Sequence, residues 1–221
     1  MKPNALSRQL LTEEVYGLIK QRILTHELPP GEKVNVDRLA REWDISNVSI
    51  REALSRLRSE GLIESIPFKG MFVPGLNVEE LNEIYDIRTR LEIFAVELAI
   101  HRIPDDELRD VLREMDAMDI GDIAGIEERL KTVHAMNERV HGVVIRHCGN
   151  GNLQRLVWSF IERVHRYLVL THRELDAEIL QSEWEEHREI LQCLARRDER
   201  AALSALQTHL ECSRRRTSSL F

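Results

Sequence analysis

Residues 45–73 read ISNVSIREALSRLRSEGLIESIPFKGMFV, and the local structure expected of them sets the architecture of the first third of the chain. Apolar residues recur at helical spacing up to Glu60, and Gly61 ends that pattern. Two short runs, Leu62–Ile66 and Met71–Val73, follow on either side of a Pro/Gly turn, which is typical of a β-hairpin. The stretch therefore predicts a helix followed directly by a hairpin.

The residues before this stretch predict two more helices. Thr12 is expected to cap the first helix, and Pro29-Pro30-Gly31 is expected to end it. A short second helix is expected from about Val36 to Trp43. Three helices and a hairpin in this order describe a winged helix-turn-helix, in which the third helix enters the major groove of DNA.

The third helix is expected to bury one face and to present Arg51, Ser55 and Arg58 on the other. Arginine suits base reading because its planar fork bonds guanine O6 and N7 together. The helix start offers N–H groups to a phosphate, and the hairpin tip can reach a neighbouring backbone or minor groove. The alternative is a solvated face that Arg51 and Arg58 form with Glu52 and Glu60. The residues predicted to contact DNA are Arg38, Ser46, Asn47, Ser49, Arg51, Ser55, Arg58, Lys69 and Gly70.

The net charge of −7 over 221 residues argues at first against nucleic acid, but the charge is unevenly distributed. Residues 1–75 have a net charge of +1, whereas residues 76–221 have a net charge of −8. This asymmetry favours two modules. Three cysteines without a CxxC pair suggest a reducing compartment and no thiolate zinc site. Without a signal-peptide core or a long apolar run, we expect a cytoplasmic protein with no membrane partner.

The remaining sequence is predicted to be helical throughout, with short loops that favour antiparallel neighbours. The fold class is therefore mainly α, with a winged helix-turn-helix at residues 1–75 and an antiparallel all-helical bundle at residues 76–221. The predicted helices of the bundle cover about 78–101, 105–118, 123–147, 151–174, 177–196 and 198–214.

The first module carries the motifs Pro30-Gly31-Glu32, Asp37-Arg38-Leu39-Ala40, Ile50-Arg51-Glu52-Ala53-Leu54, Glu60-Gly61-Leu62-Ile63 and Gly70-Met71-Phe72-Val73, and the second begins with Leu81-Asn82-Glu83-Ile84-Tyr85-Asp86-Ile87-Arg88. The motifs of the first module resemble the GntR winged-helix domain, and the one that follows resembles the start of the FCD effector domain of the FadR subfamily. The resemblance implies a transcriptional regulator, most often a repressor, that binds a double-stranded DNA operator as a homodimer and responds to a small effector. The family usually has Arg at the position of Asn47 and often at that of Asp37, so a different operator and fewer phosphate contacts are expected.

FCD domains commonly bind a divalent metal through one carboxylate and three histidines, and the resemblance places this ligand set on Asn137, His141, His187 and His209. An amide replaces the carboxylate, so the ligands are neutral before the metal binds. Imidazole and oxygen ligands suit Zn²⁺, Ni²⁺, Mn²⁺ or Fe²⁺. A metal-free polar pocket lined by the same residues is the alternative.

In this family a small carboxylate effector often completes the coordination of the metal. Arg88 matches a recurrent family arginine and is assigned to the effector, together with His134, which precedes His141 on a similar helix face. An ion pair between Arg88 and Glu92 at i+4 is the alternative role for that arginine.

Two other functions are considered. A helical-bundle metalloenzyme would use Glu138-x-x-His141, but a second ExxH pair is missing, because Trp184 and Leu206 stand three residues before the other two histidines. The second is a dimeric DNA-binding regulator that works without metal or effector.

Overall fold

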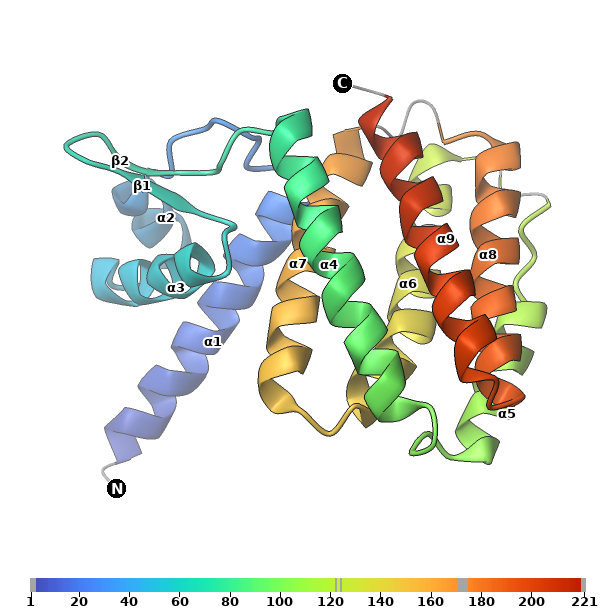
Figure 1. Ribbon diagram of the computed structural model, residues 1–221. Helices are drawn as coiled ribbons and strands as arrows, with labels where there is room; N and C mark the ends of the chain where they lie inside the picture. The colour runs from blue at the N-terminus through green and yellow to red at the C-terminus, as the bar shows by residue number, and fades with distance from the viewer. Residues whose placement is uncertain (1–2, 122, 124, 171–174, 220–221) are drawn as a thin grey trace. The chain divides into compact units, whose positions relative to one another are not determined.

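The computed structural model describes residues 3–121, 123, 125–170 and 175–219 (Figure 1). Within these residues, nine helices and a two-stranded sheet form two compact units, Met1–Leu76 and Asn77–Phe221, which we call the first and second units. Most of the described residues are helical, which confirms the mainly α fold class.

The first unit has the element order of a winged helix-turn-helix. Its two strands are antiparallel, with Glu64 opposite Phe72 and Ile66 opposite Gly70. A bridge between Lys33 and Phe72 adds the segment before α2 to the hairpin. The elements are α1 (Pro3–Leu24), α2 (Val36–Trp43), α3 (Asn47–Ser59), β1 (Glu64–Ile66) and β2 (Gly70–Phe72).

Local capping positions α3 on the core of the first unit. Ser46 caps α3 by accepting a hydrogen bond from the Ser49 backbone N–H at 3.2 Å. Asp44 makes the tight turn before it with a φ of 53°. Fully buried side chains, including Ile19 of α1 and Leu54 of α3, then pack the two helices together. One face of α3 is therefore committed to the core, and the opposite face is free for other contacts.

The start of α1 differs from the expectation. The helix already begins at Pro3, so Thr12 lies inside it and is not an N-cap. The hydroxyl of Thr12 instead donates to Glu52 of α3 at 3.4 Å. A threonine followed by two glutamates is a helix-start pattern, but such a pattern does not exclude a helix that continues further toward the N-terminus.

The second unit is an antiparallel helical bundle, as expected. In Figure 1, α6 and α7, and likewise α8 and α9, run in opposite directions. Helix α4 packs against α6, α7 and α9, and α8 packs against α5, α6 and α9. The helices are α4 (Val78–Ala99), α5 (Asp105–Asp116), α6 (Ile126–His147), α7 (Gly151–Leu170), α8 (Ala177–Ala195) and α9 (Glu199–Ser218).

The helix starts of this bundle follow from side-chain caps. Asn77, Asp176 and Asp198 each accept a hydrogen bond from the backbone N–H three residues later. The last helix continues to Ser218, four residues beyond the expected end. The expected end of α7 at residue 174 lies outside the described residues. Among the helices described here, none combines the length and the apolar character needed to cross a membrane.

Candidate functional site

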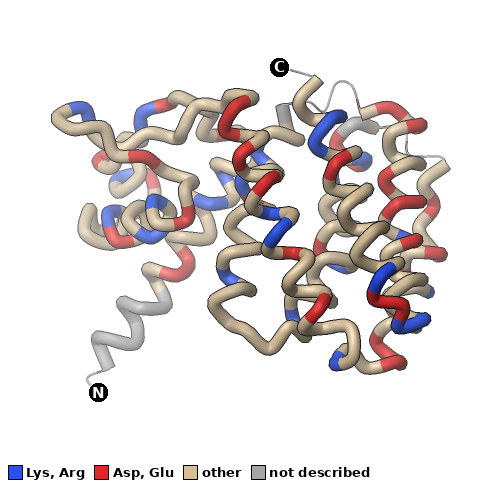
Figure 2. The backbone as a smooth tube through the Cα atoms, viewed as in Figure 1, with Lys and Arg blue, Asp and Glu red and all other residues tan. Residues whose placement is uncertain are grey.

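The exposed face of α3 carries the predicted basic residues. Arg51, Ser55 and Arg58 are exposed, while Ile50 and Leu57 on the other face are fully buried. Figure 2 shows basic residues on α3 and at the tip of the hairpin. The amphipathic pattern therefore orients α3 as the sequence predicts.

The cations of the first unit fall into two groups. Lys20, Arg22 and Arg56 each pair with a carboxylate of the same unit, at 3.5, 2.5 and 2.6 Å. Glu60 pairs with Lys20 and Arg56 and thus not with Arg58. The second group has exposed side chains that form neither an ion pair nor a hydrogen bond with a described residue, and it consists of Lys33, Arg38, Arg51, Arg58 and Lys69. We call these five residues the unpaired cations. Arg41 is also exposed and without an ion pair, but its Nε donates to the Asp37 carbonyl at 3.1 Å.

The start of α3 corrects one predicted DNA contact. Ser49 is only 3% exposed, its N–H donates to the Ser46 hydroxyl, and the two hydroxyls lie 3.0 Å apart. Ser49 therefore completes the cap and is not available to DNA. Ser46 remains exposed, with its side chain engaged in the cap.

The two departures from the family pattern contact each other. Asn47 of α3 donates from Nδ2 to Oδ1 of Asp37 of α2 at 2.8 Å. Both residues are exposed. The amide oxygen of Asn47 takes no part in this hydrogen bond, which joins the starts of the two helices. We call this contact the Asp37–Asn47 pair.

A cleft of about 760 Å³ separates α3 from the hairpin. Arg51 lines it from α3, and Lys33, Phe68 and Lys69 line it from the other side. Gly70 has a φ of 113°, and a side chain at that position would meet the Lys33 side chain at 3.2 Å. The positive φ favours glycine at this position, which opens β2 directly after the turn.

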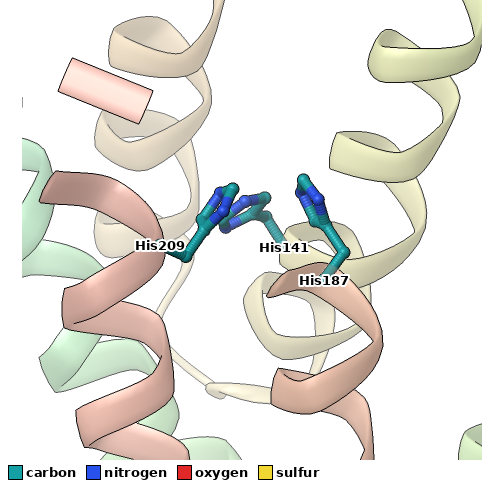
Figure 3. Close-up of side chains that lie close together, drawn as sticks. All are labelled: His141, His187 and His209. Carbon is teal, nitrogen blue, oxygen red and sulfur yellow. The ribbon is translucent and has the colours of Figure 1, made fainter. Parts of the chain in front are cut away.

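Three histidines meet inside the second unit. His141 comes from α6, His187 from α8 and His209 from α9, and their rings face one another (Figure 3). All three are at most 2% exposed, and a nitrogen of each lies within 4.8 Å of the others. We call these residues the three-histidine cluster.

Each ring of the cluster is held by a hydrogen bond at Nδ1. His141 Nδ1 bonds Glu92, His187 Nδ1 bonds the Glu183 carbonyl at 2.6 Å, and His209 Nδ1 bonds Glu186 at 2.9 Å. Such bonds orient imidazoles that ligate through Nε2. The Nε2 of His187 is buried and has no hydrogen-bond partner among the described residues. A buried acceptor without a partner is costly, and a metal ion would satisfy it.

Electrostatics keep the cluster in the form that binds metals. Burial, followed by neighbouring positive charge, lowers the pKa of His187 well below its usual range. Burial also lowers the pKa of His141. Although burial works to raise it, hydrogen bonds from Arg216 and His209 lower the pKa of Glu186 to about 2. At neutral pH, His141 and His187 are therefore neutral and the carboxylate behind His209 is ionised.

Glu183 and Glu186 could form a second metal group with His209, but Arg216 occupies both carboxylates. Its guanidinium lies 2.6 Å from Glu183 and 2.8 Å from Glu186. Arg216 thus competes with a metal for both carboxylates and offsets part of their charge, and the three-histidine cluster is the better candidate metal centre.

Arg88 lies against this cluster. It is 2% exposed, forms an ion pair with Glu92 through Nε, and places Nη2 3.4 Å from Nε2 of His141. The ion pair that the i, i+4 spacing suggested therefore exists. It also connects Arg88 to the cluster, because Glu92 bonds both Arg88 and His141.

The structure gives weaker support for Asn137 as a metal ligand and for His134 as an effector contact. Asn137 is half-buried, and its Nδ2 donates to the Val133 carbonyl at 2.9 Å, which leaves Oδ1 as the free donor atom for a cation. His134 is exposed and contacts His165 at a ring distance of 4.9 Å. The structure thus does not bring His134 into the cluster.

Sequence reasoning missed the residues that support the histidines. Glu92 entered only as a partner of Arg88, and Glu186 and Arg216 were not considered for this site. Glu186 directly precedes His187 in the sequence but contacts His209. Only the packing of α8 against α9 brings that contact about.

Comparisons with known proteins match both units. A family model described as "Bacterial regulatory proteins, gntR family" matches residues 11–73, and the FCD domain model matches residues 83–211. The Nta operon transcriptional regulator of Aminobacter aminovorans is 32% identical over 191 residues, which is 85% of each chain. The HTH-type transcriptional repressor GlaR of Escherichia coli is 26% identical over 88% of this chain and 90% of its own. The solved structure of E. coli McbR/YncC matches with a TM-score of 0.69 at 22% identity, over 91% of this chain and 94% of that one.

Proposed function

Because the chain belongs to the GntR family of bacterial regulatory proteins and carries an FCD domain, it is a DNA-binding transcriptional regulator, and we propose that it is a homodimeric repressor controlled by a small carboxylate effector bound near a metal ion. The family models and relatives are those of regulators and not of enzymes. The helical-bundle metalloenzyme is therefore set aside.

The unpaired cations carry the DNA-binding part of this proposal. A cation that has neither an ion pair nor a side-chain hydrogen bond in its own unit is free to neutralise a phosphate, and the five unpaired cations lie on α2, on α3, beside the hairpin and at its tip. Phosphate contacts of this kind supply affinity, and arginine on the recognition helix supplies base reading. We assign Arg51 to base reading, since it lines the cleft between α3 and the hairpin.

The experiment that tests this function is selection of bound duplexes from a random library with the full chain, together with mapping of bound genomic DNA. We expect one enriched motif with two related half-sites, because a dimer of winged helices reads a near-palindromic operator. Enrichment of no motif would contradict the proposal. The genes beside the mapped sites would narrow the chemical class of the effector.

Arg51→Ala is expected to relax base discrimination at one position of each half-site by about 1–3 kcal/mol. The measurement is competition binding between the selected duplex and duplexes with single base changes. Arg56→Ala is the matched control on the same helix, because Arg56 pairs with Glu13 and packs over the Tyr16 ring. Unchanged discrimination in Arg51→Ala would show that α3 does not read DNA through this residue.

The three-histidine cluster supports the metal part of the proposal. His141, His187 and His209 would ligate through Nε2, and the Asn137 amide oxygen would stand where the family has a carboxylate. Zn²⁺, Ni²⁺, Mn²⁺ and Fe²⁺ all accept such a donor set. A bound divalent ion would supply positive charge for an effector carboxylate. We propose that the Arg88 guanidinium binds part of the effector carboxylate next to the metal, although its Nε already pairs with Glu92.

Regulation then follows from a shift of population between DNA-competent and incompetent states, to which the effector binds with different affinities. We expect a small carboxylate at 100 times its dissociation constant to stabilise the metal-loaded chain by about 2.7 kcal/mol. Thermal unfolding against a panel of small mono- and dicarboxylates, with and without Zn²⁺, measures this. If neither Zn²⁺ nor any carboxylate shifts the midpoint, the chain is the metal- and effector-independent dimeric regulator.

A further inference from the structure

Phe68, at the tip of the hairpin, is the most exposed large hydrophobic residue that the structure describes. Its side chain is fully exposed, whereas the next, Val48, is 52% exposed. A solitary half-exposed apolar residue is ordinary on a protein surface. The Phe68 side chain lies at the edge of the cleft and is fully exposed, so it is available for a contact outside its own unit.

The backbone of Phe68 is strained. Its φ is 63°, in the left-handed region that non-glycine residues avoid. The Lys69 N–H donates to the Ile66 carbonyl at 3.1 Å, so Pro67 and Phe68 are the two central residues of a tight turn. Proline followed by a residue of positive φ is the arrangement of a type II turn, whose second central position favours glycine or asparagine. Phenylalanine there lowers the stability of the fold, and strain of this kind points to a function.

The charges around Phe68 indicate what it contacts. Lys69 follows it directly, and the Lys33 side chain lies beside Gly70, the first residue of β2. Both are unpaired cations, and Arg51 of α3 faces them across the cleft. An aromatic tip flanked by free cations is complementary to a surface of stacked bases between rows of phosphates. A purely apolar protein partner would leave these cations without counter-charges.

We propose that Phe68 is a wedge that enters the minor groove of the operator and partly unstacks one base step, which kinks the duplex. This inference rests on the proposed DNA-binding function. Apolar side chains of this size unstack base steps in proteins that bend DNA from the minor groove. With α3 in the major groove, the hairpin tip faces the adjacent minor groove, and Lys33 and Lys69 hold the phosphates on either side. Flexible pyrimidine–purine steps are kinked and unstacked most easily, so the wedge also favours operators that carry such a step at this position.

The test uses the full chain and the duplex recovered by selection, with 2-aminopurine placed in turn at each step flanking the α3 footprint. We expect wild-type protein to raise 2-aminopurine fluorescence at one step per half-site and to bend the duplex, as measured by energy transfer between its ends. Phe68→Gly is expected to abolish both signals and to lower affinity about tenfold or more. The same substitution is expected to raise the thermal midpoint of the free protein by a few degrees, because glycine relieves the positive φ.

Two further variants sharpen this test. Phe68→Leu keeps an apolar side chain at the same backbone position and is expected to retain most of the bend. Phe94→Ala removes an aromatic side chain that is 44% exposed on α4 of the second unit, and it should leave fluorescence and bend unchanged. Opposite signs for stability and affinity in Phe68→Gly would not arise from a merely structural tip.

The outcomes separate the wedge from the function on which it rests. If wild-type protein enriches a motif but Phe68→Gly binds and bends it equally, the wedge is overturned and the DNA-binding function stands. If Phe68→Gly changes the sedimenting mass of the free protein instead of the bend, the tip contacts a second copy, which also overturns the wedge. If wild-type protein enriches no motif, the proposed function itself fails.

Discussion

Glu92→Ala is expected to lower the free energy of unfolding by about 3–5 kcal/mol, since it leaves a buried charge without its partner. Glu92 is 2% exposed and bonds both Arg88 and Nδ1 of His141. Its removal strands the Arg88 guanidinium in the interior and takes the acceptor from His141. Urea unfolding of both proteins with a chelator present isolates this effect from metal binding.

Glu127→Ala provides the matched control. Glu127 pairs with Lys131 at the same i, i+4 spacing, but both side chains are more than 60% exposed. An exposed pair of this kind contributes little to stability, because solvent and salt screen it, so Glu127→Ala is expected to leave the free energy of unfolding almost unchanged. Replacing both buried charges, as Arg88→Met with Glu92→Leu, should recover much of the loss, because the stranded charge is then absent. A loss below about 1 kcal/mol in Glu92→Ala would contradict the importance of this network.

His187→Ala combined with His209→Ala is expected to abolish uptake of a divalent metal. The two substitutions remove two of the three imidazoles whose nitrogens converge, and the remaining His141 and Asn137 are too few for a protein site. Metal content after incubation with Zn²⁺ and desalting should fall from about one ion per chain to background. Circular dichroism verifies that the helical bundle remains folded.

His134→Ala combined with His147→Ala is the control for this measurement, since neither histidine belongs to the cluster and His147 pairs with Glu107. Glu186→Gln adds a milder test, because it weakens the bond that orients His209 and is expected to lower metal affinity by about 10- to 100-fold. Stoichiometric metal in the His187 and His209 double variant would eliminate the proposed ligand set.

The elements of the fold were predictable where short-range signals decide them. Asn77, Asp176 and Asp198 cap helices within three residues of themselves, and the predicted starts of those helices agree with the structure to within one residue. Thr12 shows the limit of such signals. It has the right neighbours for a cap, yet α1 passes through it, because a cap pattern is a local preference that a longer helix overrides.

The candidate sites were predictable only in part. The spacing of residues along α3 predicts that Arg51 is exposed and that Leu54 is buried, because both residues lie on the same helix. Ser49 was misassigned because its burial depends on how the start of α3 meets the core. The three histidines lie on three helices, and their convergence rests on the bundle. The contact between Glu186 and His209 joins residues 23 positions apart, and no sequence period indicates it.

The Asp37–Asn47 pair has an evolutionary consequence. An arginine introduced at position 47 alone would meet the Asp37 carboxylate and be neutralised by it, so it would gain no hold on DNA. An arginine at position 37 alone would lose the hydrogen bond from Asn47 without restoring the second cation. The two positions are therefore coupled, and the effect of an arginine at either one on DNA binding is expected to depend on the residue at the other.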